Sequence, residues 1–518
     1  MRLPWLAPVV AACLIAAGCE PAPTAPPPTL PAATNSSPTP SGVAPPATRP
    51  PASSPPEIPF ANALRGALDV DGIVADLARL QALTNDHGGT RAAGGEGHRA
   101  AAAFVADELR AAGYHVRLQQ VELPVFVQTG PSSLEIKGGG ARSFADIRDF
   151  KAMLFSPSAE LTAPLYALGY DPDAAPGDSG GLGCNPEDWR GVPSGAVVLM
   201  QPGGCRRHDA VVQAQAAGAV GVITAYPAWS RDAVLRPTLI DSADIRIPVL
   251  GTTGEVGNAL NDAATAHERV HISVRTSTVT GSSPNVIAET PWGDPGHVLM
   301  LGGHLDSVID GPGSNDDGSG TMTVLGIARA LAAVAGTAGG AGSPRPSPVP
   351  KVRVAFWTGE EIGLWGSRAY VASVPAGSID AYLNFDMLGS PNGVREVYDG
   401  AGTSRPAESV MIAGLFSRAL DEAGLVWQAV PLGGSSDHFS FDQAGVPTGG
   451  LFSGANELKS QGQADLFGGT ANTAEDPCYH LACDTADRVD TELLGELSRA
   501  AAWTTGALAS GQVRLSGE

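Results

Sequence analysis

Four short segments of this sequence hold side chains of the kinds that bind metal ions or move protons. Three of them come just after apolar runs, and the fourth lies in a glycine-rich stretch. The segments are His304-Leu305-Asp306, Asn315-Asp316-Asp317-Gly318, Gly359-Glu360-Glu361 and Asp386. Histidine nitrogen and carboxylate oxygen are common zinc ligands, and a carboxylate can also act as a general base. The four segments together predict a metal site.

The apolar runs predict the elements that position these segments. Residues 297–301, 352–356 and 381–385 have the character of buried strands, and residues 322–334 that of an apolar helix. Strand and helix alternate from about residue 285, which is typical of an α/β fold with a mostly parallel central sheet flanked by helices. Because functional groups gather beyond the carboxyl ends of such strands, we expect all four segments at one edge of the sheet.

Each candidate also has a plain structural explanation. A lone histidine is usually a core residue, but His304 has Asp306 two positions later, with a carboxylate suited to orient the ring. Asp316–Asp317 would cap the following helix. Glu360–Glu361 would form a solvated acidic pair. A strand end next to Phe356 is a poor place for uncompensated charge, so we favour metal ligation.

A further histidine comes from one of two segments. His438 lies in Ser-Ser-Asp-His-Phe, and His480 lies in Pro-Cys-Tyr-His-Leu-Ala-Cys-Asp. The residue types alone do not choose between them. A disulfide around Tyr479 and His480 would hold both side chains rigidly, which benefits a metal ligand.

The first 60 residues predict export. Arg2 precedes an apolar run that ends in small residues, so residues 1–19 are an expected signal peptide. The run resembles a lipoprotein signal, with Cys19 in Leu-Ile-Ala-Ala-Gly-Cys as the expected lipidation site and Cys13 as the second choice. A plain secretory signal is the other interpretation. Residues 20–60, rich in Pro, Ala, Thr and Ser, predict an extended linker.

Cysteines and charge agree with an exported protein. Four cysteines remain after the signal, which suggests two disulfides in an oxidising compartment. Of the three pairings, Cys184–Cys205 and Cys478–Cys483 are favoured because each keeps its bridge within one candidate domain. The net charge of −21 argues against nucleic-acid binding, which needs clustered Lys and Arg. Any membrane contact is expected only through the N-terminal lipid.

The 518 residues divide into more than one folded unit. Residues 61–150 begin with a helical pattern, interrupted at His87 by the loop His-Gly-Gly-Thr-Arg-Ala-Ala-Gly, and form the first part of the domain that bears the metal site; residues 271–518 form the rest. Between them, residues 151–270 change to short β-rich runs. The stretch from Gly204 to Ile223 resembles the protease-associated domain, although an ordinary βαβ fragment of a larger sheet has the same pattern.

The motifs of the C-terminal part resemble the co-catalytic di-zinc aminopeptidases, in particular the secreted streptomycete type. These motifs are GGHLDSV, SNDDGSGT, GEEIGLWGS, NFDMLG and PCYHLACD, within residues 285–487. The helical front of the chain fits as well, and an inserted protease-associated domain is a known elaboration of the family. The resemblance departs at Ser435, where the streptomycete type has an arginine near the amino end of the substrate.

The resemblance implies a role for each residue. His304 and Asp386 are expected on one zinc, Glu361 and His480 on the other, and Asp316 on both; Glu360 is the expected general base and Tyr479 the group that polarises the scissile carbonyl. His438 then lies outside the ligand set. Cobalt or manganese would also suit this carboxylate-rich set. Some relatives carry a calcium ion, for which no residues are assigned here.

The implied reaction is removal of the N-terminal residue from peptides with a free N-terminus. Two zinc ions activate one water, and Glu360 takes its proton. An apolar pocket, with Met387 and Phe452 as expected walls, would favour large apolar residues. The alternatives are a single-zinc relative of glutaminyl cyclase type, a carboxypeptidase-type relative, and a surface binding protein with a decayed active site. The complete set of ligands and the intact Glu360 and Tyr479 argue against the last.

Overall fold

The computed structural model describes residues 57–173, 182–201, 204–225, 234, 236, 238–240, 244–337, 349–375 and 377–515. The predicted signal peptide, the lipidation site Cys19 and most of the linker lie outside these residues. Helix α1 (Pro59–Ala67) begins inside the stretch expected to be linker, so that segment ends before residue 59.

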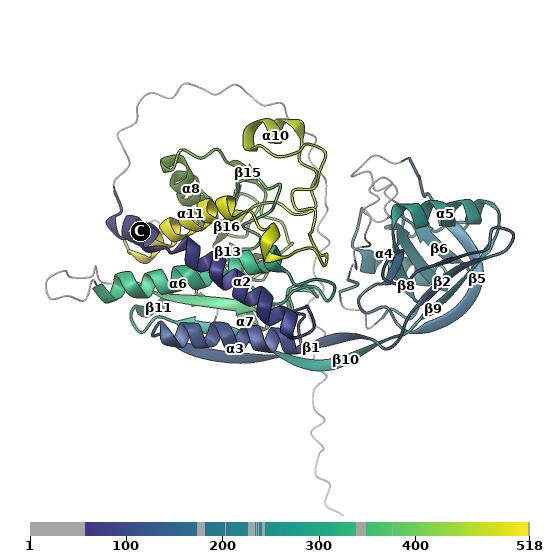
Figure 1. Ribbon diagram of the computed structural model, residues 1–518, viewed down its shortest axis with the longest axis horizontal. Helices are drawn as coiled ribbons and strands as arrows, with labels where there is room; N and C mark the ends of the chain where they lie inside the picture. Colours follow the sequence, from purple (N-terminus) through teal and green to yellow (C-terminus); the bar gives the residue numbers. More distant parts are fainter. Residues whose placement is uncertain are drawn as a thin grey trace, which may run out of the picture. The chain divides into compact units, whose positions relative to one another are not determined.

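Eight strands form the larger sheet, in the order β1-β10-β12-β11-β13-β16-β14-β15 (Figure 1). Their bounds are β1 (His115–Gln128), β10 (Thr276–Glu289), β11 (Asp294–His304), β12 (Pro350–Trp357), β13 (Ala381–Phe385), β14 (Glu396–Tyr398), β15 (Gln428–Val430) and β16 (Thr448–Phe452). The central strands β12, β11, β13 and β16 run parallel.

The sheet as a whole is mixed, so the expected mostly parallel arrangement holds only at its centre. β1 pairs antiparallel with β10, β10 with β12, and β14 with β16. The reason at the first edge is the insert, which in the structure spans residues 129–275 rather than the expected 151–270, because strands β2 to β4, within residues 133–152, also belong to its sheet. The chain leaves for the insert along β1 and returns along β10, and the two strands pair from His115↔Glu289 to Gln128↔Thr276. The insert begins where β1 ends and ends where β10 begins, at the same end of both strands, and the two strands therefore run antiparallel.

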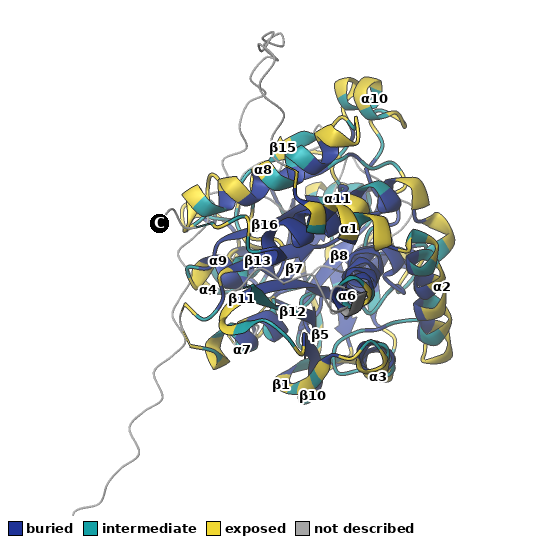
Figure 2. Ribbon diagram, turned by 90° about the vertical axis from the view of Figure 1, so that its left-hand side faces the viewer, coloured by how far each residue is buried: buried dark blue, intermediate teal, exposed yellow. Residues whose placement is uncertain are grey.

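Helices cover both faces of this sheet. One core joins the sheet to α1, α2 (Val70–Asp86), α3 (Glu96–Ala111), α6 (Gly320–Thr337), α8 (Pro406–Glu422) and α11 (Thr491–Ala509). A second, smaller core joins the sheet to α7 (Trp365–Ser373) and α9 (His438–Gln443). The short helix α10 (Gln461–Phe467) contributes no buried residue. Outer helices such as α3 and α8 expose one side, whereas α6 is buried in the middle (Figure 2).

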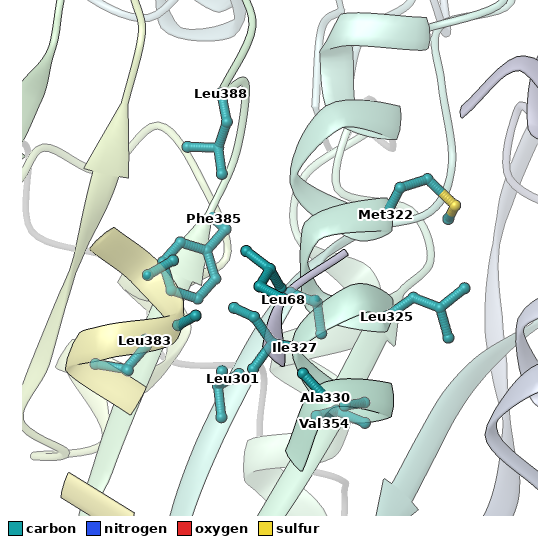
Figure 3. Packing of buried hydrophobic residues seen from close by; sticks show 14 of the residues in the cluster. Leu68, Leu301, Met322, Leu325, Ile327, Ala330, Val354, Leu383, Phe385 and Leu388 are labelled. Carbon is teal, nitrogen blue, oxygen red and sulfur yellow. The ribbon is translucent and has the colours of Figure 1, made fainter. Parts of the chain in front are cut away.

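Helix α6 is the apolar helix that the sequence predicted at 322–334. The stretch 314–335 is long and apolar enough to cross a membrane, but 78% of its apolar window is buried in the fold, so it is a core helix. Leu325 and Ile327 belong to the same buried cluster as Leu301, Val354 and Leu383 of the central strands (Figure 3). This packing fixes the start of α6 against the carboxyl ends of β11 and β13.

The insert contains its own eight-stranded mixed sheet, in the order β3-β2-β9-β5-β6-β7-β8-β4. Its strands are β2 (Ser133–Lys137), β3 (Arg142–Phe144), β4 (Phe150–Ala152), β5 (Ala159–Leu168), β6 (Val197–Met200), β7 (Gly221–Ala225), β8 (Val249–Thr252) and β9 (Arg269–Val274). Helices α4 (Arg207–Ala216) and α5 (Gly254–Thr265) pack on it. A disulfide joins Cys184 to Cys205, the pairing that the local spacing favoured.

Candidate metal centre

The expected ligands lie together at one edge of the larger sheet. His304 is the last residue of β11, Glu360–Glu361 follow β12 and Asp386 follows β13; these three strands are neighbours and parallel. Asp316 lies in the irregular turn η2 (Ser314–Ser319) that leads into α6, where its φ/ψ of −104°/93° depart from helical values. The carboxyl ends of the central strands therefore gather these side chains as the sequence predicted.

Asp316 is shared between the two histidines. Its Oδ1 atom lies 3.0 Å from His304 Nε2, and its Oδ2 atom lies 3.1 Å from His480 Nε2. Asp386 Oδ1 is 3.5 Å from His304 Nε2, and Glu361 Oε2 is 3.0 Å from His480 Nε2. The side chains thus form two groups, each with a histidine and a carboxylate of its own, joined by the two oxygens of one aspartate.

The chemistry of these groups fits metal ions. Asp316 Oδ2, Glu361 Oε1 and Asp386 Oδ1 are buried atoms that make no well-aligned hydrogen bond in the described part of the chain. One ligand atom each from His304, Asp316 and Glu361 lies within 4.8 Å of the others. Burial lowers the pKa of His304, but the carboxylates of Asp386 and Glu360 outweigh it and raise that pKa well above its ordinary value. The same field attracts a bound cation.

The sequence left open whether Asp316 and Asp317 cap the following helix or bind metal. In the structure the two residues have different surroundings. Asp317 Oδ1 accepts hydrogen bonds from the backbone N–H groups of Gly320 at 2.9 Å and Met387 at 3.1 Å, and its Oδ2 accepts from His304 N at 3.1 Å. Asp317 therefore caps α6 and ties η2 to two strand ends. Although its carboxylate also lies near His304 and Asp386, its oxygens are already engaged, which leaves Asp316 as the candidate ligand.

Asp306 orients His304 differently from the expectation. The Nδ1 atom of His304 lies 3.0 Å from the main-chain oxygen of Asp306, whereas the nearer carboxylate oxygen is 3.9 Å away. That carboxylate oxygen accepts from Glu360 N at 3.1 Å instead. The backbone turn after β11 thus fixes the imidazole, and the Asp306 side chain fixes the loop that carries the two glutamates.

Glu360 and Tyr479 lie beside the candidate ligands. Glu360 Oε2 is 4.0 Å from His304 Nε2, and burial, together with the charges of Asp386 and Glu361, raises the pKa of Glu360 well above its usual value. The ring of Tyr479 stacks on His480 with 3.8 Å between centroids. Burial and the nearby carboxylates raise the pKa of Tyr479, so its hydroxyl stays protonated.

The structure separates the two candidate histidines. His480 lies with Asp316 and Glu361, in the short loop closed by the disulfide Cys478–Cys483. His438 begins α9, and its Nε2 lies 2.7 Å from the main-chain oxygen of Gly433. No contact between His438 and the ligand atoms is found among the described residues, in keeping with its place outside the expected ligand set.

Two supporting residues were not predicted. Arg91, in the glycine-rich loop before α3, is fully buried and donates from Nε to Leu305 O at 3.0 Å and from Nη2 to Gly313 O at 2.9 Å. Asp484 accepts from the backbone N–H groups of Asn315 at 2.7 Å and of Asp316 at 3.1 Å. Both act on the backbone of the 305–316 segment, and a backbone partner leaves no signature in the sequence.

Known proteins share this architecture. The sequence model described as Peptidase family M28 matches residues 285–505, and that of the PA domain matches residues 161–260. The solved aminopeptidase from Aneurinibacillus sp. strain AM-1 superimposes with a TM-score of 0.65 at 23% identity, over 86% of this chain and 95% of that one. A zinc aminopeptidase from Bacillus subtilis gives 0.58 at 23% identity, over 86% and 95%.

Several proteins are more similar to this chain in sequence than these two solved structures are. A Mycobacterium tuberculosis protein named "Probable lipoprotein aminopeptidase LpqL" is 37% identical over 86% of both chains. An aminopeptidase of Pseudomonas aeruginosa is 34% identical over 85% of this chain and 80% of its own, and leucine aminopeptidase 2 of Arthroderma otae is 33% identical over 87% of each. This chain therefore belongs to peptidase family M28 and carries an inserted PA domain.

Proposed function

We propose that this member of family M28 is an exported zinc metallo-aminopeptidase that holds two zinc ions and removes apolar N-terminal residues from peptides. The observation that carries the proposal is the position of Asp316 between two histidine–carboxylate groups. A single-metal site of the glutaminyl cyclase kind needs no such shared carboxylate. The relatives named as aminopeptidases, one of them a lipoprotein, support the activity and the export.

The distances between the side chains support a division of the ligands between two ions. His304 and Asp386 would hold one, His480 and Glu361 the other, and Asp316 both. Bound there, zinc would lower the pKa of a coordinated water and withdraw electrons from the scissile carbonyl. Cobalt or manganese would suit the same oxygen-rich set.

Glu360 is the group in position to move the proton. It lies beside His304 at the end of β12, bears no ligand role in either group, and has a pKa raised by burial and by neighbouring carboxylates, which suits a base that must also release a proton. Glu360 would take a proton from the attacking water and give it to the leaving amine. The hydroxyl of Tyr479, protonated beside His480, would donate to the oxygen that becomes negative.

The site favours the free amino end of a peptide. Glu360 and Asp386 form an acidic corner that suits an α-ammonium group and disfavours a C-terminal carboxylate. The buried Met387 and the partly buried Phe452, which stacks on Tyr398 at 6.2 Å between centroids, are the proposed apolar walls. The family member named leucine aminopeptidase 2 supports this preference.

The first experiment compares leucine p-nitroanilide with its N-acetylated form, with and without a chelator. We expect the free amine alone to be cleaved, the activity to disappear with the chelator, and zinc to restore it. Equal cleavage of both substrates would point to an endopeptidase or another amidase. Cleavage of neither would point to the cyclase alternative if the chain binds one metal ion, and to a narrow substrate range or the binding-protein alternative if it binds two.

A further inference from the structure

A buried ionic cluster ties the insert to the metal-bearing domain. Asp310 lies between His304 and Asp316 in the chain, and its Oδ2 atom is 3.0 Å from Arg236 Nε and 3.1 Å from Lys151 Nζ, both in the insert. Arg236 and Lys151 are 6% and 5% exposed. Burial raises the pKa of Asp310, but the two cations outweigh it and hold that pKa below its usual value.

Arg236 has further contacts besides its ion pair with Asp310. Its Nη1 atom donates to the main-chain oxygen of Ala152 at 3.0 Å and to Gln128 Oε1 at 3.3 Å, and its guanidinium lies 5.8 Å from the ring centroid of Phe126. A guanidinium with so many partners is held in one orientation. Arg236 is therefore anchored at Asp310.

A few residues later, the insert touches the loop that carries the two glutamates. Ile240 packs against Gly363 so closely that a methyl group on Gly363 would lie 2.9 Å from Ile240 Cγ2. Leu239 N donates to Leu154 O at 3.3 Å, and Thr238 forms an isolated β-bridge with Leu154. These contacts hold Thr238 and Leu239 against the rest of the insert. Ile240 nevertheless leaves 42% of its surface exposed.

Both contact points belong to loops that bear site residues. Asp310 follows His304 and Asp306, and Gly363 lies two residues beyond Glu361. Ile240 is four residues beyond Arg236 in the chain, so the two lie at most about 14 Å apart. The described part of this stretch, here called the rim segment (Arg236 and Thr238–Ile240), therefore contacts two of the loops that bear residues of the candidate metal centre.

We propose that Ile240 is a specificity-determining residue, held at the rim of the metal centre by Asp310, that favours an apolar residue directly after the scissile bond. The inference rests on the proposed aminopeptidase function. If the acidic corner of Glu360 and Asp386 holds the amino end, the rest of the peptide must leave toward the rim. An exposed isoleucine there offers apolar surface to the first residue of the departing chain.

The test uses the full chain with zinc and the substrates leucyl-phenylalaninamide and leucyl-serinamide. The readout is the ratio of their kcat/KM values, which is independent of the amount of active enzyme. We expect Ile240→Ser to lower this ratio about tenfold, the usual effect of one apolar contact in a pocket. Ile147→Ser is the matched control, because Ile147 is an isoleucine of the insert that is 47% exposed, and it should leave the ratio unchanged.

Asp310 is tested as a positioning residue by a double-mutant cycle. Asp310→Asn should lower the same ratio in the wild-type background and change it less than about twofold in the Ile240→Ser background, because it acts through Ile240. Asp310→Glu should recover part of the loss. A purely structural role would lower the melting temperature and leave the ratio intact, which would overturn the proposal.

The outcomes separate the two proposals. An active wild-type enzyme whose ratio is unchanged by Ile240→Ser overturns the role of Ile240 alone. A wild-type chain that binds zinc but hydrolyses neither dipeptide amide nor leucine p-nitroanilide overturns the aminopeptidase proposal, and the inference falls with it.

Discussion

Two adjacent glutamates at the end of β12 have the same chemistry and different surroundings. Glu361 Oε2 is 3.0 Å from His480 Nε2, while Glu360 lies 4.0 Å from His304 Nε2 and its backbone N–H is held by Asp306. The two residues lie in the turn that follows β12, in which Glu360 O accepts from Gly363 N at 2.8 Å, and their side chains meet different neighbours. In the proposed site Glu361 would therefore reach a metal ion, while Glu360 would face the attacking water.

This difference predicts distinct effects of the same substitution. Glu360→Gln should lower kcat by about 10²- to 10⁴-fold, the contribution typical of a general base, and keep two zinc ions per chain. Glu361→Gln should lower the zinc content as well, because it removes a charged ligand. Elemental analysis beside kcat measurements on both variants is the check. Equal zinc loss in the two variants would contradict the assigned roles.

A buried carboxyl away from the metal centre predicts a pH effect on stability. Glu475 is 2% exposed, and burial, with Glu396 and Glu457 nearby, raises its pKa to about 8. A carboxyl group whose pKa is raised in the folded state stabilises the fold fully below its ordinary pKa, and that stability is lost as the pH rises toward 8. Glu475→Gln stays neutral at every pH.

The variant and the wild type should therefore unfold alike near pH 5, and the variant should be the more stable of the two at pH 8. Urea unfolding of both proteins at the two pH values measures the difference, in which other titrating groups cancel. A difference between the proteins that does not change with pH would show that Glu475 keeps its ordinary pKa.

At the scale of elements, the sequence predicts a strand best where the whole strand has the same surroundings, for example where it is buried along its length. The central strands β11, β12 and β13 are short apolar runs buried on both faces, so composition alone identifies them. Strand β10 contains Thr-Ser-Thr-Val-Thr-Gly-Ser-Ser-Pro and is largely exposed in its first half. Its pairing with β1 depends on the insert between them, which local patterns do not encode.

The candidate site also has a part that local sequence predicts and a part that depends on the fold. Residue types and strand ends indicate His304, Glu360, Glu361 and Asp386, because each has distinctive chemistry at a predictable place. The choice between Asp316 and Asp317 depends on the non-helical backbone of η2, which no residue type specifies. The contribution of Arg91 is equally hidden, since its acceptors are main-chain oxygens.

At the scale of the molecule, the metal centre and the insert belong to different cores. The candidate ligands come from β11, η2, β12, β13 and the Cys478–Cys483 loop, all attached to the core that α6 shares with the larger sheet. The insert packs around separate hydrophobic clusters and has its own disulfide, Cys184–Cys205. A ligand that binds only the folded metal centre stabilises the core that forms it.

Calorimetry of the full chain should therefore resolve two unfolding transitions, of which zinc shifts only one. At a free zinc concentration 100 times its dissociation constant, each bound zinc ion should stabilise the metal-bearing domain by about 2.7 kcal/mol, and a chelator should remove this stabilisation. Asp316→Asn, which loses the shared ligand, should abolish most of the shift and leave the transition of the insert in place. A single transition that moves as a whole with zinc would mean that the rim contacts of Asp310 couple the two cores into one cooperative unit.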